Sequence, residues 1–205
     1  MSAPTPYRRN ADNVRFWDDA EVYYSPDPDA KVNADGTFGD AWASTGFLNA
    51  GADLGQERDT ERQEAEGFGG RLLKTRQRFK KDTWAFTAAE DNETVHKLMW
   101  PNSPYIVDGT GVLRVPRDAE GVFARKLVDA DGAITIDVTR AMASCYPSNL
   151  NNADGGHQTR EFTVEVRPDE DNALYDRFHK SASEDALEPL EVIRIEAAGT
   201  GGGGE

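Results

Sequence analysis

The sequence predicts a mainly β protein, a two-sheet β-sandwich or barrel with one or two short flanking helices. Three observations favour this class. Short segments alternate between apolar and polar side chains, as half-buried strands do. Gly and Pro together supply 29 of the 205 residues, and the turn-forming triplet Ala-Asp-Gly occurs three times. Only two short segments have the three- and four-residue apolar spacing of a helix.

The stretch Gly70–Trp100 contains the clearest transition, from a basic strand to a short helix. Asp91 or Asn92 can cap the helix by accepting a hydrogen bond from a free backbone N–H. Pro101 ends the helix, since proline cannot continue it. We expect this corner to close the core through alternating strand residues and one helix face: Trp84, Phe86, Val95, Leu98 and Met99.

Other strands are expected on both sides of this corner, in the ranges 14–24, 45–49, 121–129, 133–142, 159–167 and 189–197. In the first, Trp17 and either Tyr23 or Tyr24 are candidate core residues. The third and fourth form a hairpin, because Ala-Asp-Gly separates them. In the range 159–167, we expect Arg160 to face outward and three apolar residues to face inward: Phe162, Val164 and Val166.

The remaining segments divide the chain into one domain and its appendages. We expect an N-terminal arm over residues 1–13, a single domain over 14–197 and a flexible Gly-rich tail over 198–205. Within the domain, the ranges 25–42 and 50–84 are expected to be extended loops, the second of them a long hairpin. A polar loop is predicted over 144–157. A second helix is predicted within 169–180, where acids precede Lys180 as the helix dipole prefers.

The strongest charge pattern surrounds the Gly-Phe-Gly-Gly sequence at 67–70. An acid-rich segment precedes it: Asp53, Glu57, Asp59, Glu61, Glu64 and Glu66. A basic segment without acids follows it: Arg71, Lys74, Arg76, Arg78, Lys80 and Lys81. Three interpretations stay open, namely a solvated hairpin, a subunit interface in which the charges set orientation, and a nucleic-acid-binding strip. The neighbouring acids disfavour the last.

Composition excludes several classes of function. A net charge of −14 with a pI near 4.6 disfavours tight binding to DNA or anionic lipid. We expect no membrane segment and no signal peptide, because no apolar run is long enough. The single cysteine, Cys145, is expected to be a small buried apolar residue. None of His96, His157 and His179 has a second ligand or nucleophile nearby in sequence, so we expect no enzyme, no metal and no cofactor.

The order of these features resembles a known family. A strand with Gly46–Leu48 precedes the acid-rich segment, Phe68 lies between glycines, a basic strand follows, and Phe86–Asn92 leads into the helix. This layout, over roughly Phe16 to Arg194, resembles the major tail proteins of long non-contractile-tailed phages, notably those that infect actinobacteria. No single short motif carries the resemblance, which depends on order and spacing.

The resemblance implies a specific architecture and role. Members of this family share the two-sheet fold of the type VI secretion tube protein and assemble into stacked hexameric rings. The resulting tube holds the tape-measure protein, contacts tail-end proteins, and lets double-stranded DNA pass during ejection without specific binding. The expected location is the virion, after synthesis in the host cytoplasm. The hairpin near 53–84 and the arm over 1–13 would contact neighbouring subunits.

Residue-level expectations follow from this reading. An acidic bore would repel DNA phosphates. We therefore expect the band of basic residues between Arg58 and Lys97 to face other subunits. The candidate interface comprises Glu57, Asp59, Glu61, Glu64, Glu66, Arg71, Lys74, Arg76, Arg78 and Lys80. The alternatives are another ring-forming phage structural protein, such as a head–tail connector, a decoration protein or a secretion-tube subunit, and, less favoured, a carbohydrate-binding β-sandwich.

Overall fold

A computed structural model describes residues 16–50, 54–68, 70–152, 156–184 and 188–189. The expected arm over 1–13, the expected tail over 198–205 and nearly all of the last expected strand lie outside these ranges. The described chain is mainly β, with one short helix, which confirms the predicted class. Its elements are β1 (Trp17–Ser25), β2 (Ala43–Ser44), β3 (Gln56–Gly67), β4 (Arg71–Ala88), α1 (Glu93–Met99), β5 (Ala119–Asp129), β6 (Ile134–Thr139), β7 (Ala143–Asn151), β8 (Thr159–Val166), β9 (Tyr175–Lys180) and β10 (Glu188–Pro189).

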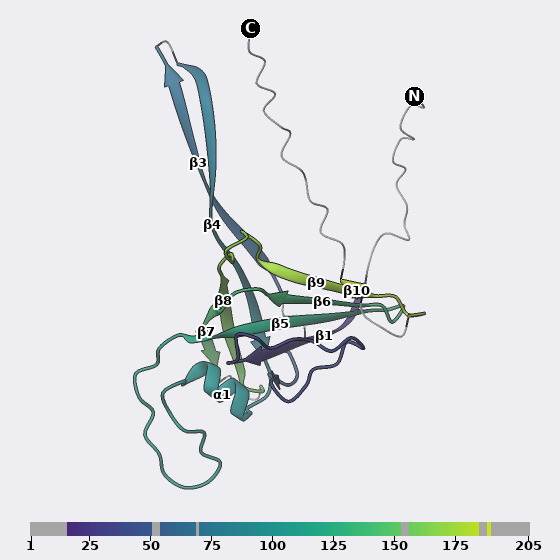
Figure 1. The fold of residues 1–205 in the computed structure, drawn as a ribbon. Helices are drawn as coiled ribbons and strands as arrows, with labels where there is room; N and C mark the ends of the chain where they lie inside the picture. Colours follow the sequence, from purple (N-terminus) through teal and green to yellow (C-terminus); the bar gives the residue numbers. More distant parts are fainter. Residues whose placement is uncertain (1–15, 51–53, 69, 153–155, 185–187, 190–205) are drawn as a thin grey trace.

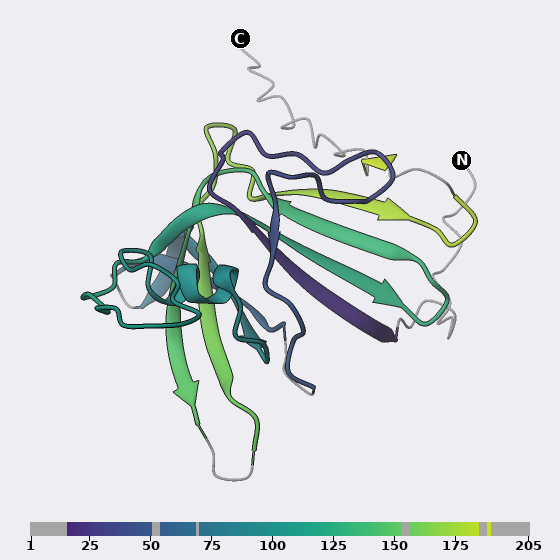
Figure 2. The same ribbon diagram turned by 90° about the horizontal axis from the view of Figure 1, so that it is seen from below.

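All strands belong to one antiparallel sheet that folds over at β5. The main path is β10-β9-β6-β5-β7-β8-β4-β3, and β1 also pairs with β5 and with β2. The start of β5 pairs with β7, whereas the rest of β5 pairs with β1 and β6. The two predicted layers are therefore halves of one sheet, and their strands run in different directions in Figure 2. Gly121 lies at this change of partner, where a Cβ atom would be 2.5 Å from the Ser25 carbonyl oxygen.

The main core lies between the two halves. Alternation places every second side chain of β4 and β8 on the inner face, where they meet residues of β1 and β5. Trp84 and Phe86 are 2% and 1% exposed. The other large members of the core are Val22, Tyr24, Phe123, Phe162, Val164 and Val166.

Helix α1 closes one end of this core, as the sequence predicts. Of the two candidate caps, Asn92 is the one used, because its side-chain oxygen accepts a 2.9 Å hydrogen bond from the Val95 amide. Val95 and Leu98 are fully buried against the sheet, and Met99 is nearly so. The helix thus anchors the end of β4 that is remote from the β3–β4 turn (Figure 1).

A smaller apolar cluster covers the opposite face of the β5–β6 half. Residues 26–42 contain no named strand and fold over this face, where Trp42 is buried. The Trp42 indole N–H donates to the Lys31 carbonyl, and Phe38 stacks on Tyr23. This segment therefore has its own apolar contacts despite its polar sequence.

The predicted second helix is wrong, because residues 175–180 form strand β9. Asp169 accepts hydrogen bonds from the amides of Asp171 and Ala173, and Asn172 has a φ of 60°, so the acidic segment makes a turn. Helix cannot continue through a left-handed residue. The chain then pairs with β6 along the whole of β9. The acids before Lys180 match the charge preference of a helix dipole and led to the helix prediction. Pairing with the free edge of β6 instead makes this segment a strand.

Four further expectations from the sequence are wrong. Residues 45–49 form no strand beyond the isolated bridge from Leu48 to Ala88. Residues 143–151 form β7 and not a polar loop, with Pro147 accommodated at a bulge against β8. Arg160 is 7% exposed because it shares the inner face of β8 with Phe162. Trp17 is 47% exposed, while Tyr24 of the same strand is buried. Cys145 is fully buried, as expected, and burial raises the pKa of its thiol well above the ordinary value.

Candidate assembly surface

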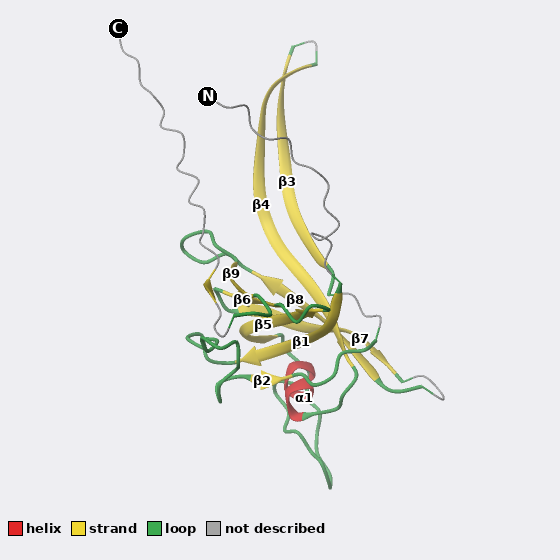
Figure 3. Cartoon of the chain, turned by 90° about the vertical axis from the view of Figure 1, so that its right-hand side faces the viewer, coloured by secondary structure: helices red, strands yellow, loops and turns green. Residues whose placement is uncertain are grey.

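The hairpin of β3 and β4 projects far from the body of the molecule (Figures 1 and 3). Strand β4 has 18 residues, of which Asp82–Ala88 pair with β8 and the preceding residues pair only with β3. The expected extended segment over 50–84 is thus mainly two long strands, with a turn at 67–70. Among the residues that the structure describes, no second layer packs against the projecting half, whose side chains are nearly all exposed.

The ten predicted interface residues all lie on this hairpin, five on each strand. Nine are exposed and Glu61 is half-buried. Asp59 faces Lys81 and Glu61 faces Arg78 across the ladder, yet Arg58–Asp82 is the one ion pair within the hairpin among described residues. Most of the hairpin charges are therefore available to a second molecule. The predicted corner residues Trp84, Phe86, Val95 and Leu98 are all buried away from this surface.

The hairpin makes a positive projection on a negative molecule. Residues 56–81 contain eight bases and five acids, a net charge of +3, which leaves −17 for the rest of a chain whose total is −14. Strand β4 supplies the excess, because Arg71–Lys81 contains bases and no acid. Such a separation of charge favours contact between the hairpin of one copy and the body of another.

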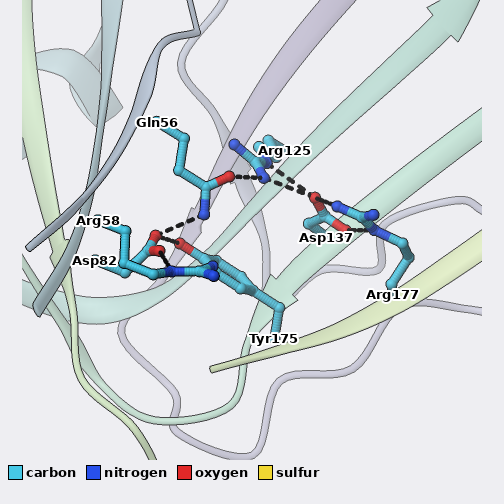
Figure 4. Close-up of polar contacts among 7 residues, drawn as sticks. All are labelled: Gln56, Arg58, Asp82, Arg125, Asp137, Tyr175 and Arg177. Carbon is cyan, nitrogen blue, oxygen red and sulfur yellow. Dashed lines mark hydrogen bonds and ion pairs between the residues drawn. The ribbon is translucent and has the colours of Figure 1, made fainter. Parts of the chain in front are cut away.

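A buried polar network ties the base of the hairpin to the opposite layer (Figure 4). The Asp82 side chain is fully buried and accepts hydrogen bonds from Gln56 at 2.7 Å, Arg58 at 3.1 Å and the Tyr175 hydroxyl at 2.7 Å. Burial and the bond to Asp82 together raise the pKa of Tyr175. A buried carboxylate needs several such donors, since an unpaired buried charge costs several kcal/mol.

Asp137 of β6 is the second centre of this network. It is 3% exposed and accepts from Arg125 at 2.8 Å and 3.0 Å and from Arg177 at 2.5 Å and 2.8 Å. Burial alone raises the pKa of the Asp137 carboxyl, but the bond from Arg177 and the charge of Arg125 outweigh it and hold this pKa below its ordinary value. Arg125 also donates to Gln56 at 2.8 Å, which joins the two centres.

These contacts fix the direction in which the hairpin leaves the body. Gln56 and Arg58 belong to β3, while Tyr175 and Arg177 belong to β9 of the other half of the sheet. Sequence reasoning missed the network. The available signal was Asp82, which interrupts a run of bases at the point where apolar alternation begins.

Exposed apolar side chains gather at two opposite ends of the molecule. At the hairpin turn, Phe68 is fully exposed, and Leu72 and Leu73 are 52% and 66% exposed. At the other end, the α1–β5 loop presents six exposed apolar residues: Tyr105, Ile106, Val107, Val112, Leu113 and Val115. Figures 1 and 3 both show the turn and the loop on opposite sides of the body. Clusters of this kind mark interaction surfaces.

A groove of about 660 Å³ lies between the start of β1 and the segment 44–50. Phe47 and Trp17, 79% and 47% exposed, contribute aromatic walls. Its described lining contains four carboxylates and no basic residue: Asp18, Asp19, Glu21 and Glu90. Glu90 also accepts a hydrogen bond from the Phe47 amide, which holds the segment 44–50 against the end of β4.

The described residues contain no cluster of His, Cys, Asp and Glu with the geometry of a metal site. Their helix is also too short to cross a membrane.

Comparisons with known proteins found similarity among solved structures. No family model matches the chain, and no curated protein matches it. Among solved structures, the chain is similar to the tube-terminating cap of the anti-feeding prophage, with 10% identity and a TM-score of 0.38, over 89% of this chain and 97% of the cap chain. Because that score is low, we infer the function from the geometry of this chain.

Proposed function

We propose that this chain is a structural subunit of a phage tail that assembles into stacked hexameric rings forming the tail tube. The observation that carries the proposal is the hairpin. A projection of two long strands, exposed on both faces and opposite in charge to its own body, has no function inside a monomer. It costs conformational entropy to order, and contact with other copies would offset that cost.

The sheet supports the same proposal through its edges. Strand β3 is the last strand of its half, and among the described strands its twelve residues pair only with β4. Long unpaired edges promote association with further strands unless they are covered. A ring in which β3 of one subunit adds to the sheet of the next removes these edges, as barrel closure does.

Charge separation supports a role as a conduit for DNA. With the basic hairpin directed at neighbouring subunits, the surface left for the bore belongs to the acidic body. Basic residues in contact with DNA add affinity that depends on salt, so an acidic wall allows DNA to pass without adhering. In this proposal the tape-measure protein fills the bore before ejection.

The test is electron microscopy of the purified protein at increasing concentration, with Arg76→Glu/Arg78→Glu as the variant. Both residues are exposed, so we expect the variant to fold normally and to fail in tube growth. Variant tubes of normal length and number would contradict the role of the hairpin. The images also distinguish a tube from the isolated ring of a connector and from the lattice of a decoration protein.

A further inference from the structure

We propose that the groove formed by the start of β1 and the segment 44–50 receives the hairpin turn of a second copy of this chain. This inference rests on the proposed function and identifies the receiving surface, which is separate from the ten residues of the hairpin. The contact joins the apolar, basic turn of one copy to the aromatic, acidic groove of the next.

The geometry excludes the same contact within one copy. The turn at 67–70 immediately precedes β4, while the groove lies beyond the other end of β4, where Leu48 bridges to Ala88 and Glu90 lines the groove. A strand of 18 residues separates the two, and at about 3.3 Å per residue it spans roughly 55 Å. Only the groove of another molecule is within reach of the turn.

Charge complementarity selects the groove over the other exposed apolar surface. Four carboxylates line the groove and no basic residue belongs to the described lining, although Lys126 beside it pairs with Glu21 at 3.2 Å; Asp18, Asp19 and Glu90 make no ion pair among the described residues. The α1–β5 loop is also apolar, but it carries Arg114 and Arg117 against Asp108 and Asp118, a net charge of zero, so it attracts a basic turn less than the groove does. Arg71 and Lys74, which flank Leu72 and Leu73, would face carboxylates in the groove but a loop with equal numbers of acids and bases.

The apolar parts of the two surfaces also match. Phe68, Leu72 and Leu73 extend from the hairpin with at least half of each side chain in water. The groove presents Phe47 and Trp17, which are 79% and 47% exposed. Its volume of about 660 Å³ corresponds to roughly 20 water molecules at about 30 Å³ each. Expelling this water from between aromatic and aliphatic side chains favours association.

The contact joins two different surfaces, so it is heterologous. A repeated heterologous contact produces an open series of copies unless its rotation closes a ring. The span of β4 and the fixed base of the hairpin would then set the spacing between successive subunits. The buried network at Asp82 and Asp137 makes that spacing reproducible, because it holds the hairpin in one direction.

The test is a charge exchange between the two surfaces. One variant carries Asp18→Lys/Asp19→Lys in the groove, and the other carries Arg71→Glu/Lys74→Glu beside the turn; all four positions are exposed. Each variant alone should raise the concentration needed for tube formation about tenfold or more. An equimolar mixture should restore assembly, because each hairpin then meets a groove of opposite charge. A single chain with all four substitutions should also assemble.

The control is Asp29→Lys/Asp40→Lys, which makes the same change in net charge on the exposed 25–42 segment and should assemble like wild type. Light scattering and electron microscopy measure assembly, and circular dichroism confirms the fold of each variant. If the wild type forms tubes and each single variant assembles equally well, the docking proposal is wrong but the proposed function stands. The same holds if the single variants are impaired and their mixture does not restore assembly. Wild-type protein that stays monomeric at every concentration would overturn the proposed function and the docking with it.

Discussion

The two halves of strand β4 have the same extended backbone but differ in burial. From Asp82 to Ala88 the strand pairs with β8 on one side, and on the other side it bonds first to β3 and then to Gly55 and the segment 47–49; every second side chain is buried. From Arg71 to Lys80 it pairs only with β3, and Phe79 is the one half-buried side chain. Both halves are hydrogen-bonded ladders, although the outer half contains two register shifts between β3 and β4. Hydrogen bonding between strands therefore makes the hairpin, whereas burial decides which half stabilises the monomer.

The boundary between these halves is chemical as well as geometric. Between Arg71 and Lys81 the positions on both faces are mostly polar or basic, with Leu72, Leu73 and Phe79 as the apolar exceptions, whereas from Trp84 to Ala88 the inward positions are aromatic or small. Asp82 itself is buried and binds donors from β3 and β9. The comparison predicts that substitutions on the two sides of Asp82 differ in kind. Inner changes should affect folding, and outer changes should affect association.

The largest expected effect distinguishes two phenylalanines. Phe86→Ala removes a 1% exposed ring that stacks on Phe162, and should lower the free energy of unfolding by about 3–5 kcal/mol. Phe68→Ala removes a fully exposed ring at the turn and should change it by less than about 0.5 kcal/mol. Urea denaturation of the monomer measures both. Equal losses would show that the hairpin belongs to the folding core.

The next largest effect concerns the buried network. Asp137→Asn removes the negative charge between Arg125 and Arg177 but keeps the shape of the side chain, and should cost about 2–3 kcal/mol. Asp29→Asn, an exposed acid on the 25–42 segment, is the matched control and should be nearly neutral. Denaturant midpoints at neutral pH give the comparison. A neutral Asp137→Asn would mean that the arginines find other partners.

A smaller effect is expected where the network holds the hairpin. Tyr175→Phe removes only the hydroxyl that donates to Asp82 at 2.7 Å, and a hydrogen bond to a charged group contributes about 1.5–3 kcal/mol. Two other donors remain on Asp82, so we place the loss near the lower limit. If this bond also fixes the hairpin, hydrogen exchange at the amides of β3 should accelerate. Unchanged exchange together with reduced stability would separate the two roles.

The smallest expected effect is a dependence on pH. The pKa of Asp137 is below its ordinary value in the folded chain, so the folded state binds the proton less readily than the unfolded state does. The corresponding stability is complete above the ordinary carboxyl pKa of about 3.9 and is lost as pH falls through the lower folded value. Unfolding experiments between neutral pH and acid should show a shallower decline for Asp137→Asn. Parallel curves would exclude Asp137 as a source of the acid sensitivity.

Local signals predicted the parts of the fold that depend on neighbouring residues. The Asn92 cap, the β5–β6 hairpin, the inward faces of β4 and β8 and the burial of Cys145 all follow from periodicity, turn chemistry or side-chain type. The errors occur where distant pairing decided the outcome. The segment that the sequence predicts as a second helix forms strand β9, because it pairs with the edge of β6. Arg160 faces inward because strand alternation places it on the inner face despite its charge. The network escaped notice because its members come from five strands.

For the assembly surface, sequence identified the hairpin through its segregated charges but not the groove. Asp18, Asp19, Glu21 and Glu90 are unremarkable in a chain with 37 acids. They form one surface only because Leu48 bridges to Ala88 and brings the segment 44–50 beside the end of β4 and the start of β1. A long-range contact of this type leaves no local pattern.

The burial of Cys145 makes the chain convenient for site-directed chemistry. Its thiol is inaccessible and strongly disfavours the thiolate, which is the form that reacts with maleimides and disulfides. A cysteine introduced elsewhere would therefore be the reactive thiol in the folded protein, without removal of the native one. Fluorophores or cross-linkers placed at chosen positions could then report distances between subunits while the interior remains intact.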